Sequence, residues 1–255
     1  MYRLLCKNEL TFAIILIVLY VVGSSLMQQV SASLGIDYLA ETVFVVALAA
    51  VLAVFVLRRG LARHVGLCPP ALPAARMLFY LPLWLIAGGC LVFGAGTVLS
   101  PRSVLLHTVM MMAVGFLEEL IFRGFLFRGI AAKGSRTRAV VIASLTFGIG
   151  HIVNLFNGYA LLDSLTQIVF AVSVGFLLTM LFVRTGSLWA CIVFHILNNV
   201  LTVFETGEVL EHLTGSSTAA SLTALGVRLC LTLGYLLYVC KALPPRELTD
   251  GEIPV

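Results

Sequence analysis

The chain has 255 residues, of which 60% are hydrophobic and only 11% are charged, whereas a soluble domain is usually about 25% charged. This composition excludes an ordinary soluble globular protein, and the net charge of +4 is accompanied by no nucleic-acid-binding motif. The six cysteines are scattered and form no CxxC pair, so their spacing predicts neither a zinc knuckle nor a disulfide framework.

Eight apolar stretches follow one another along the chain, and each approaches the roughly 20 residues that a helix needs to cross a bilayer. They cover residues 10–27, 42–57, 77–99, 104–127, 139–155, 161–183, 187–204 and 220–240. The first is long for a signal peptide and no small-x-small cleavage site follows it, so we expect it to be retained. The sequence therefore predicts an all-α fold, a polytopic membrane helix bundle with about eight transmembrane helices.

The charges between these stretches predict the orientation. Connections on the N-terminal side of the membrane carry the basic residues Arg58, Arg59, Arg63, Arg76, Arg128, Lys133, Arg136, Arg138 and Arg184. The opposite connections carry the acidic residues Asp37, Glu41, Asp163, Glu205, Glu208 and Glu211. Because cytoplasmic loops are enriched in Lys and Arg, we expect both termini to be cytoplasmic and the proline-containing segment 58–76 to be a cytoplasmic loop.

The fourth stretch contains charged residues that are costly to place in a membrane. Glu118, Glu119 and Arg123 lie within it, and such residues normally face the interior of a bundle and mark function. Glu119 and Arg123 are four residues apart and can pair on one helix face, whereas Glu118 points about 100° away and remains available for chemistry. The alternative is that all three form one electrostatic clasp between helices.

Two histidines occupy later stretches. His151 lies in the fifth and His195 in the seventh, with Asn199 four residues beyond His195 and therefore on the same helix face. A single histidine in a transmembrane helix is often a hydrogen-bonding link between helices. Two of them on spans near a glutamate-bearing span favour a common site instead.

These side chains could together hydrolyse a peptide bond. Glu118, placed near His151, could take a proton from a water as that water attacks a carbonyl carbon. The His195 ring N–H and the Asn199 amide could then stabilise the oxyanion. Zinc is the competing use, because Glu118, His151 and His195 resemble a catalytic zinc set with one open position, although no HExxH motif is present. We expect no cofactor, with Zn²⁺ as the alternative.

Three motifs carry a resemblance to a known family. EExxxR occurs as Glu118, Glu119 and Arg123, FxxxH as Phe147 and His151, and HxxxN as His195 and Asn199. In this order they are similar to the motifs of the CAAX proteases and bacteriocin-processing enzymes, which include the type II CAAX prenyl (Ras-converting) endopeptidases.

The resemblance implies an intramembrane endopeptidase of about eight spans. Glu118 and His151 would activate water, His195 and Asn199 would hold the oxyanion, and Glu119, Arg123 and Phe147 would support the site. The expected domains are N-terminal transmembrane helices (1–100), a catalytic core (101–205), and a C-terminal transmembrane helix with a cytoplasmic tail (206–255).

The expected partners are membrane lipid and a membrane-associated protein or peptide substrate, either a prenylated CAAX-type protein or a leader peptide, with no nucleic acid. One alternative is a non-catalytic membrane immunity or scaffold protein of the same fold. Another is an ion or proton transporter that uses the acidic pair and the histidines as a relay.

Overall fold

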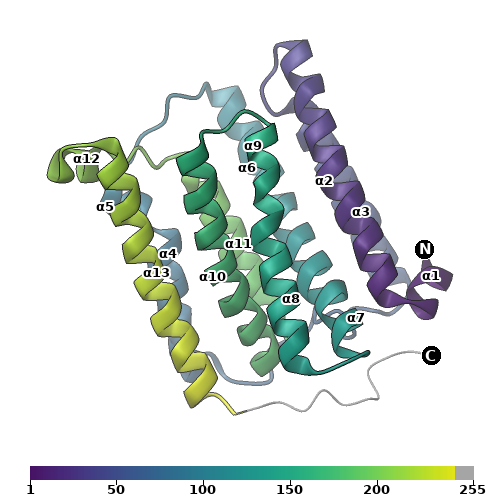
Figure 1. Cartoon of the computed structure of the whole chain (residues 1–255). Helices are drawn as coiled ribbons and strands as arrows, with labels where there is room; N and C mark the ends of the chain where they lie inside the picture. The colour runs from purple at the N-terminus through teal and green to yellow at the C-terminus, as the bar shows by residue number, and fades with distance from the viewer. Residues whose placement is uncertain (245–255) are drawn as a thin grey trace.

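The computed structural model describes residues 1–244, with the backbone alone at residues 90 and 91. Within this part of the chain all regular structure is helical, and a single isolated bridge pairs Ala95 with Glu205. The helices form an upright bundle (Figure 1). The predicted all-α membrane bundle is therefore confirmed.

Within residues 1–244, six helices are long and apolar enough to cross a membrane. They are α2 (Glu9–Leu34), α3 (Leu39–Arg58), the continuous helix formed by α6 (Pro101–Glu119), η2 (Leu120–Phe127) and α7 (Arg128–Ala131), the continuous helix formed by α8 (Arg136–Ile149), η3 (Gly150–Ile152) and α9 (Val153–Phe156), α10 (Leu161–Thr185) and α13 (Ser217–Ala242). Shorter helices are α1 (Tyr2–Lys7), η1 (Ala74–Tyr80), α4 (Leu81–Ala87), α5 (Cys90–Phe93), α11 (Trp189–Thr202) and α12 (Glu208–Thr214).

Two of the eight expected spans are shorter than a full crossing, so the count of eight is not confirmed. Residues 77–99 were expected to form one span but are divided among η1, α4 and α5. Leu78, Phe79 and Tyr80 have φ angles of +52°, +49° and +58°, which a right-handed helix cannot contain. The other short helix is α11, whose 14 residues span about 21 Å at 1.5 Å per residue, less than the roughly 30 Å hydrocarbon core.

Polar side chains and glycines define the helix ends. Four spanning helices begin at a side chain that accepts a hydrogen bond from a backbone N–H of the first turn, which satisfies a donor that the helix leaves unpaired. These residues are Asn8 for α2, Ser100 for α6, Ser135 for α8 and Ser216 for α13. Gly186 ends α10 in the left-handed conformation, with φ of +68°, which glycine adopts without a steric penalty.

Two helices lie at the centre of the bundle. We compared the buried share of the apolar 18-residue stretch in each spanning helix. This share is 56% in α10 and 50% in the helix from Pro101 to Ala131, but only 22% in α2 and in α13. The central α10 packs against α8 and α13, and α6 packs against α3 and α11. The outer helices expose many large apolar side chains, as a lipid-facing surface requires.

The contact between α6 and α11 depends on Gly115. A Cβ atom at this position would lie 2.7 Å from Ile196 Cγ1 and 2.9 Å from the Ile196 backbone nitrogen. Small residues allow two helix backbones to approach closely in a membrane protein. This close approach places His195, the neighbour of Ile196, beside the last turn of α6.

Replacing Gly115 by alanine is expected to force α6 and α11 apart and to lower stability by about 1–3 kcal/mol, the usual effect of overpacking. Gly226→Ala is the matched control, because a Cβ atom added at this glycine of α13 meets nothing within 4 Å. The control should be neutral or stabilising, since alanine is the better helix former. Thermal unfolding in detergent micelles measures both, and equal midpoints for the two variants would contradict the packing argument.

Candidate active site

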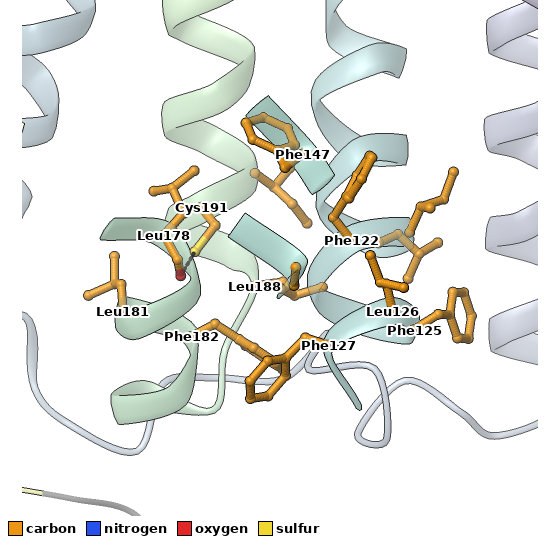
Figure 2. Packing of buried hydrophobic residues seen from close by; sticks show 14 of the residues in the cluster. Phe122, Phe125, Leu126, Phe127, Phe147, Leu178, Leu181, Phe182, Leu188 and Cys191 are labelled. Carbon is orange, nitrogen blue, oxygen red and sulfur yellow. Dashed lines mark hydrogen bonds between the residues drawn. The ribbon is translucent and has the colours of Figure 1, made fainter. Parts of the chain in front are cut away.

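The site is built where α6 passes into η2, a segment with π-helical hydrogen bonding. Every residue of η2 from Leu120 to Phe127 is buried, and π-helical turns are rare and frequently occur at functional sites. Figure 2 shows Phe127 beside Phe182 of α10 and Phe122 near Phe147 of α8, while Phe125 lies on the other side, where it packs against Phe12 of α2. The last residues of α6 are therefore held by a rigid apolar surrounding.

Glu119 and Arg123 form a fully buried ion pair. Arg123 Nη1 donates to Glu119 Oε1 at 2.8 Å, and both residues are 0% exposed. A second guanidinium nitrogen donates to the Gly175 carbonyl oxygen of α10 at 3.4 Å. The guanidinium also lies 4.2 Å from the ring centroid of Phe147, within the range of a cation–π contact. The pair that the spacing predicts is thus present and anchored to two other helices.

His195 lies between the two glutamates. Its Nδ1 is 2.8 Å from Glu119 Oε1, and its Nε2 is 3.5 Å from Glu118 Oε2. An ionised carboxylate can only accept hydrogen bonds, so an ionised Glu119 places a proton on Nδ1. Glu119 therefore orients the imidazole and leaves Nε2 facing Glu118, in the way that a third group orients the base in many hydrolytic sites.

The two oxygens of the Glu118 carboxylate have different surroundings. Oε1 accepts a hydrogen bond of 2.7 Å from the Tyr20 hydroxyl. Oε2 is buried and makes no hydrogen bond to any described residue, although His195 Nε2 lies within ion-pair distance. Glu119 Oε2 is also buried without a hydrogen bond to a described residue, so the two adjacent carboxylates differ in their charged partners. Glu119 is paired with Arg123, whereas Glu118 has no arginine or lysine partner among the described residues.

Tyr20 is a site residue that the sequence interpretation missed. It lies on α2, near the middle of a 26-residue helix, and its side chain is only 9% exposed. Tyrosines in membrane proteins are enriched at the two interfaces, so a tyrosine near the middle of a span was the one signal available. Nothing in the pattern indicated which residue its hydroxyl would contact.

His151 contacts the site through Phe147. It lies in η3, where α8 tightens at its end, and its Nδ1 is 3.2 Å from the Phe147 carbonyl oxygen. The Phe147 ring meets the His151 ring edge-on at 5.6 Å and the His195 ring edge-on at 5.7 Å between centroids. Within residues 1–244 no hydrogen bond joins His151 to Glu118 or His195, so the aromatic ring is what relates the two histidines.

Asn199 lies one turn beyond His195 on α11. Its Oδ1 accepts a hydrogen bond of 3.3 Å from the neighbouring Asn198 side chain. In the described part of the chain its side chain makes no hydrogen bond to Glu118 or His195. The structure therefore places Asn199 on the helix that carries His195 but does not join it to the carboxylates.

The described side chains were also compared with the geometry of a metal site. Among the described residues, no group of three or more His, Cys, Asp or Glu is arranged to hold a metal ion. Glu118, His151 and His195, the set considered for zinc, are not such a group. The Nδ1 atoms of the two histidines already face the Phe147 carbonyl oxygen and Glu119.

What the arrangement offers is a proton acceptor next to an oriented imidazole. A carboxylate with one free oxygen can accept a proton from a bound water. The imidazole, when protonated on both nitrogens, can donate from Nε2 to a developing negative charge. General base catalysis and charge stabilisation are therefore both available within a few ångströms.

The central part of the chain matches a known family. Residues 100–201 match the family model described as type II CAAX prenyl endopeptidase Rce1-like. No curated protein and no solved structure matches the chain. The matched region contains all three motifs, and it confirms the resemblance drawn from them. At the level of the family, it supports a CAAX-type intramembrane protease.

Proposed function

We propose that the protein is an intramembrane endopeptidase in which Glu118 activates a water to cleave a peptide bond of a membrane-associated substrate. The observation that carries this proposal is the free Oε2 atom of Glu118, which is buried and faces His195 Nε2 at 3.5 Å. The adjacent Glu119 is bound to Arg123 and is not available for this role. The family match over residues 100–201 supports the same reaction class.

In the proposed reaction, Glu118 Oε2 takes a proton from water while the water oxygen bonds to the carbonyl carbon of the substrate. The carbonyl oxygen becomes an oxyanion, which His195 Nε2–H and the Asn199 amide stabilise. The C–N bond then breaks, the nitrogen takes the proton from Glu118, and a carboxylic acid and an amine leave. Donation from Nε2 requires a His195 that is protonated on both nitrogens, and its Nδ1 faces the Glu119 carboxylate at 2.8 Å.

His151 and Phe147 complete the proposed site. His151 would hold the attacking water on the side of Glu118, as the family motifs imply. Phe147 packs against both histidines and lies under the Arg123 guanidinium, so it would hold these three side chains in fixed positions relative to one another. The proposed mechanism uses no metal ion, and zinc held by Glu118, His151 and His195 is the alternative.

The proposed substrate is a prenylated CAAX-type protein, with a leader peptide as the other peptide class. The description of the matched family supports the first. The proposed orientation places the basic end of the bundle in the cytoplasm. Figure 1 shows α1 and the C-terminal end of α13 at the same end of the bundle, and basic residues such as Arg58, Lys133 and Arg136 lie in the helix termini and connections of that end.

The proposal is tested by terminus-resolved proteomics on membranes that contain either the wild type or Glu118→Gln at matched levels. New protein termini are expected only with the wild type, and their sequences identify the substrate. Repeating the wild-type measurement with a chelator tests the zinc alternative, and cleavage should continue. If both proteins are folded and no termini differ in membranes that contain prenylated and leader-peptide substrates, the protein is a non-catalytic immunity or scaffold protein instead.

A further inference from the structure

Tyr20 belongs to the candidate site, although the helix on which it lies, α2, carries none of the three motifs. It is 98 residues from Glu118 in the sequence, and its hydroxyl donates to Glu118 Oε1 at 2.7 Å. Tyr20 lies on α2, a peripheral helix in which only 22% of the apolar 18-residue stretch is buried. A polar group buried in an apolar bundle needs a partner, and Glu118 provides it.

The hydrogen bond fixes the orientation of the Glu118 carboxylate. The terminal torsion of a glutamate side chain is broad, so the plane of the carboxylate can rotate unless a contact holds one of its two equivalent oxygens. With Oε1 held by Tyr20, Oε2 is the oxygen that faces His195. The attacking water would therefore meet Glu118 at one defined atom.

The other groups near Glu118 cannot replace Tyr20. His195 from α11 faces the opposite oxygen, and Glu119 on the same helix is an acceptor that is already bound to Arg123. The Tyr20 hydroxyl is a neutral donor, so it can hold one oxygen of the carboxylate without adding a further charge to the site. Glu118 thus remains both oriented and able to accept a proton.

We propose that Tyr20 is a positioning residue of the reaction, which holds Glu118 Oε1 so that Oε2 faces the water and His195. This inference rests on the proposed role of Glu118 as the base. Its rival is a structural role, in which the same hydrogen bond only ties α2 to α6.

The variant that separates these roles is Tyr20→Phe, which keeps the ring and removes the hydroxyl. Tyr235→Phe is the matched control, because Tyr235 is also buried and its hydroxyl donates to a backbone carbonyl, that of Met77, at 2.7 Å. Both variants lose one buried hydrogen bond between elements. Only the first loses one to Glu118.

Two readouts are taken on the purified protein in liposomes. The first is the rate at which a hydrophobic carbodiimide labels Glu118 at neutral pH, followed by mass spectrometry with Glu41 as internal reference. Carbodiimides react with protonated carboxyl groups, so losing a donor to the ionised form should speed labelling several-fold in Tyr20→Phe and leave Tyr235→Phe unchanged. The second is cleavage of a farnesylated CAAX peptide, where kcat should fall about tenfold while KM stays constant.

The two readouts distinguish a failure of the Tyr20 inference from a failure of the proposed function. Equal labelling rates in wild type and Tyr20→Phe overturn the inference, even if Glu118→Gln is inactive and the proposed function stands. A wild type that cleaves the peptide no faster than Glu118→Gln overturns the proposed function for this substrate, while the labelling rates still decide whether Tyr20 controls Glu118. Equal losses of kcat in Tyr20→Phe and Tyr235→Phe would assign Tyr20 the structural role.

Discussion

Glu118→Gln is expected to fold like the wild type and to lose at least about a hundredfold in kcat, the lower range for removing a general base. The glutamine keeps the shape of the side chain and an oxygen that can accept from Tyr20, whose hydroxyl lies 2.7 Å from Oε1 in the wild type. An amide cannot accept the proton of the attacking water. Activity should therefore be lost while stability is retained.

The measurement is kcat on the substrate identified by its new termini, together with the thermal midpoint of each purified variant. Glu41→Gln is the matched control, because Glu41 is also a buried glutamate on a spanning helix but bonds to Ser31 outside the site. A Glu118→Gln protein with full activity would eliminate Glu118 as the base. A lowered midpoint in this variant alone would indicate a structural carboxylate.

Arg123→Met is expected to destabilise the protein by about 3–5 kcal/mol, the usual effect of breaking one side of a buried ion pair. The substitution removes the 2.8 Å bond to Glu119, the bond to the Gly175 carbonyl and the stacking on Phe147. It leaves the Glu119 carboxylate fully buried, with His195 as its remaining partner.

A double variant separates the charge from the packing. Glu119→Gln with Arg123→Met leaves no unpaired charge, so it should recover part of the stability that Arg123→Met loses. Unfolding in mixed micelles of increasing dodecyl sulfate content measures the free energy of unfolding for each variant. A single variant as stable as the wild type, or a double variant less stable than the sum of the singles, would contradict this account.

The features that could be predicted from the sequence are those with a local cause. The Glu119–Arg123 pair follows from a spacing of four residues, and the six long spans follow from runs of apolar residues. The contact between Tyr20 and Glu118 joins residues 98 apart, and no periodicity encodes which faces of two distant helices meet.

The interrupted span has a similar origin. Residues 77–99 are apolar enough for one span, but left-handed backbone at Leu78–Tyr80 precedes α4, and α5 already ends at Gly94, where φ is +123°. Hydropathy is insensitive to backbone conformation. His151 and Asn199 belong to the family motifs and stay predicted site residues, and the motif spacing did not indicate that they contact the Phe147 carbonyl and Asn198. Side-chain direction of this kind depends on tertiary packing rather than on spacing.

The arrangement of the two glutamates also has a consequence for biosynthesis. The partner of Glu119 lies four residues away in the same helix, so the pair can form as that helix enters the bilayer, which lowers the cost of inserting an arginine. Glu118 instead depends on Tyr20, which is made earlier, and on His195, which is made later. A chain emerging from the ribosome therefore carries its proposed base in the membrane before its imidazole, and the proposed reaction would have to wait until α11 has joined the bundle.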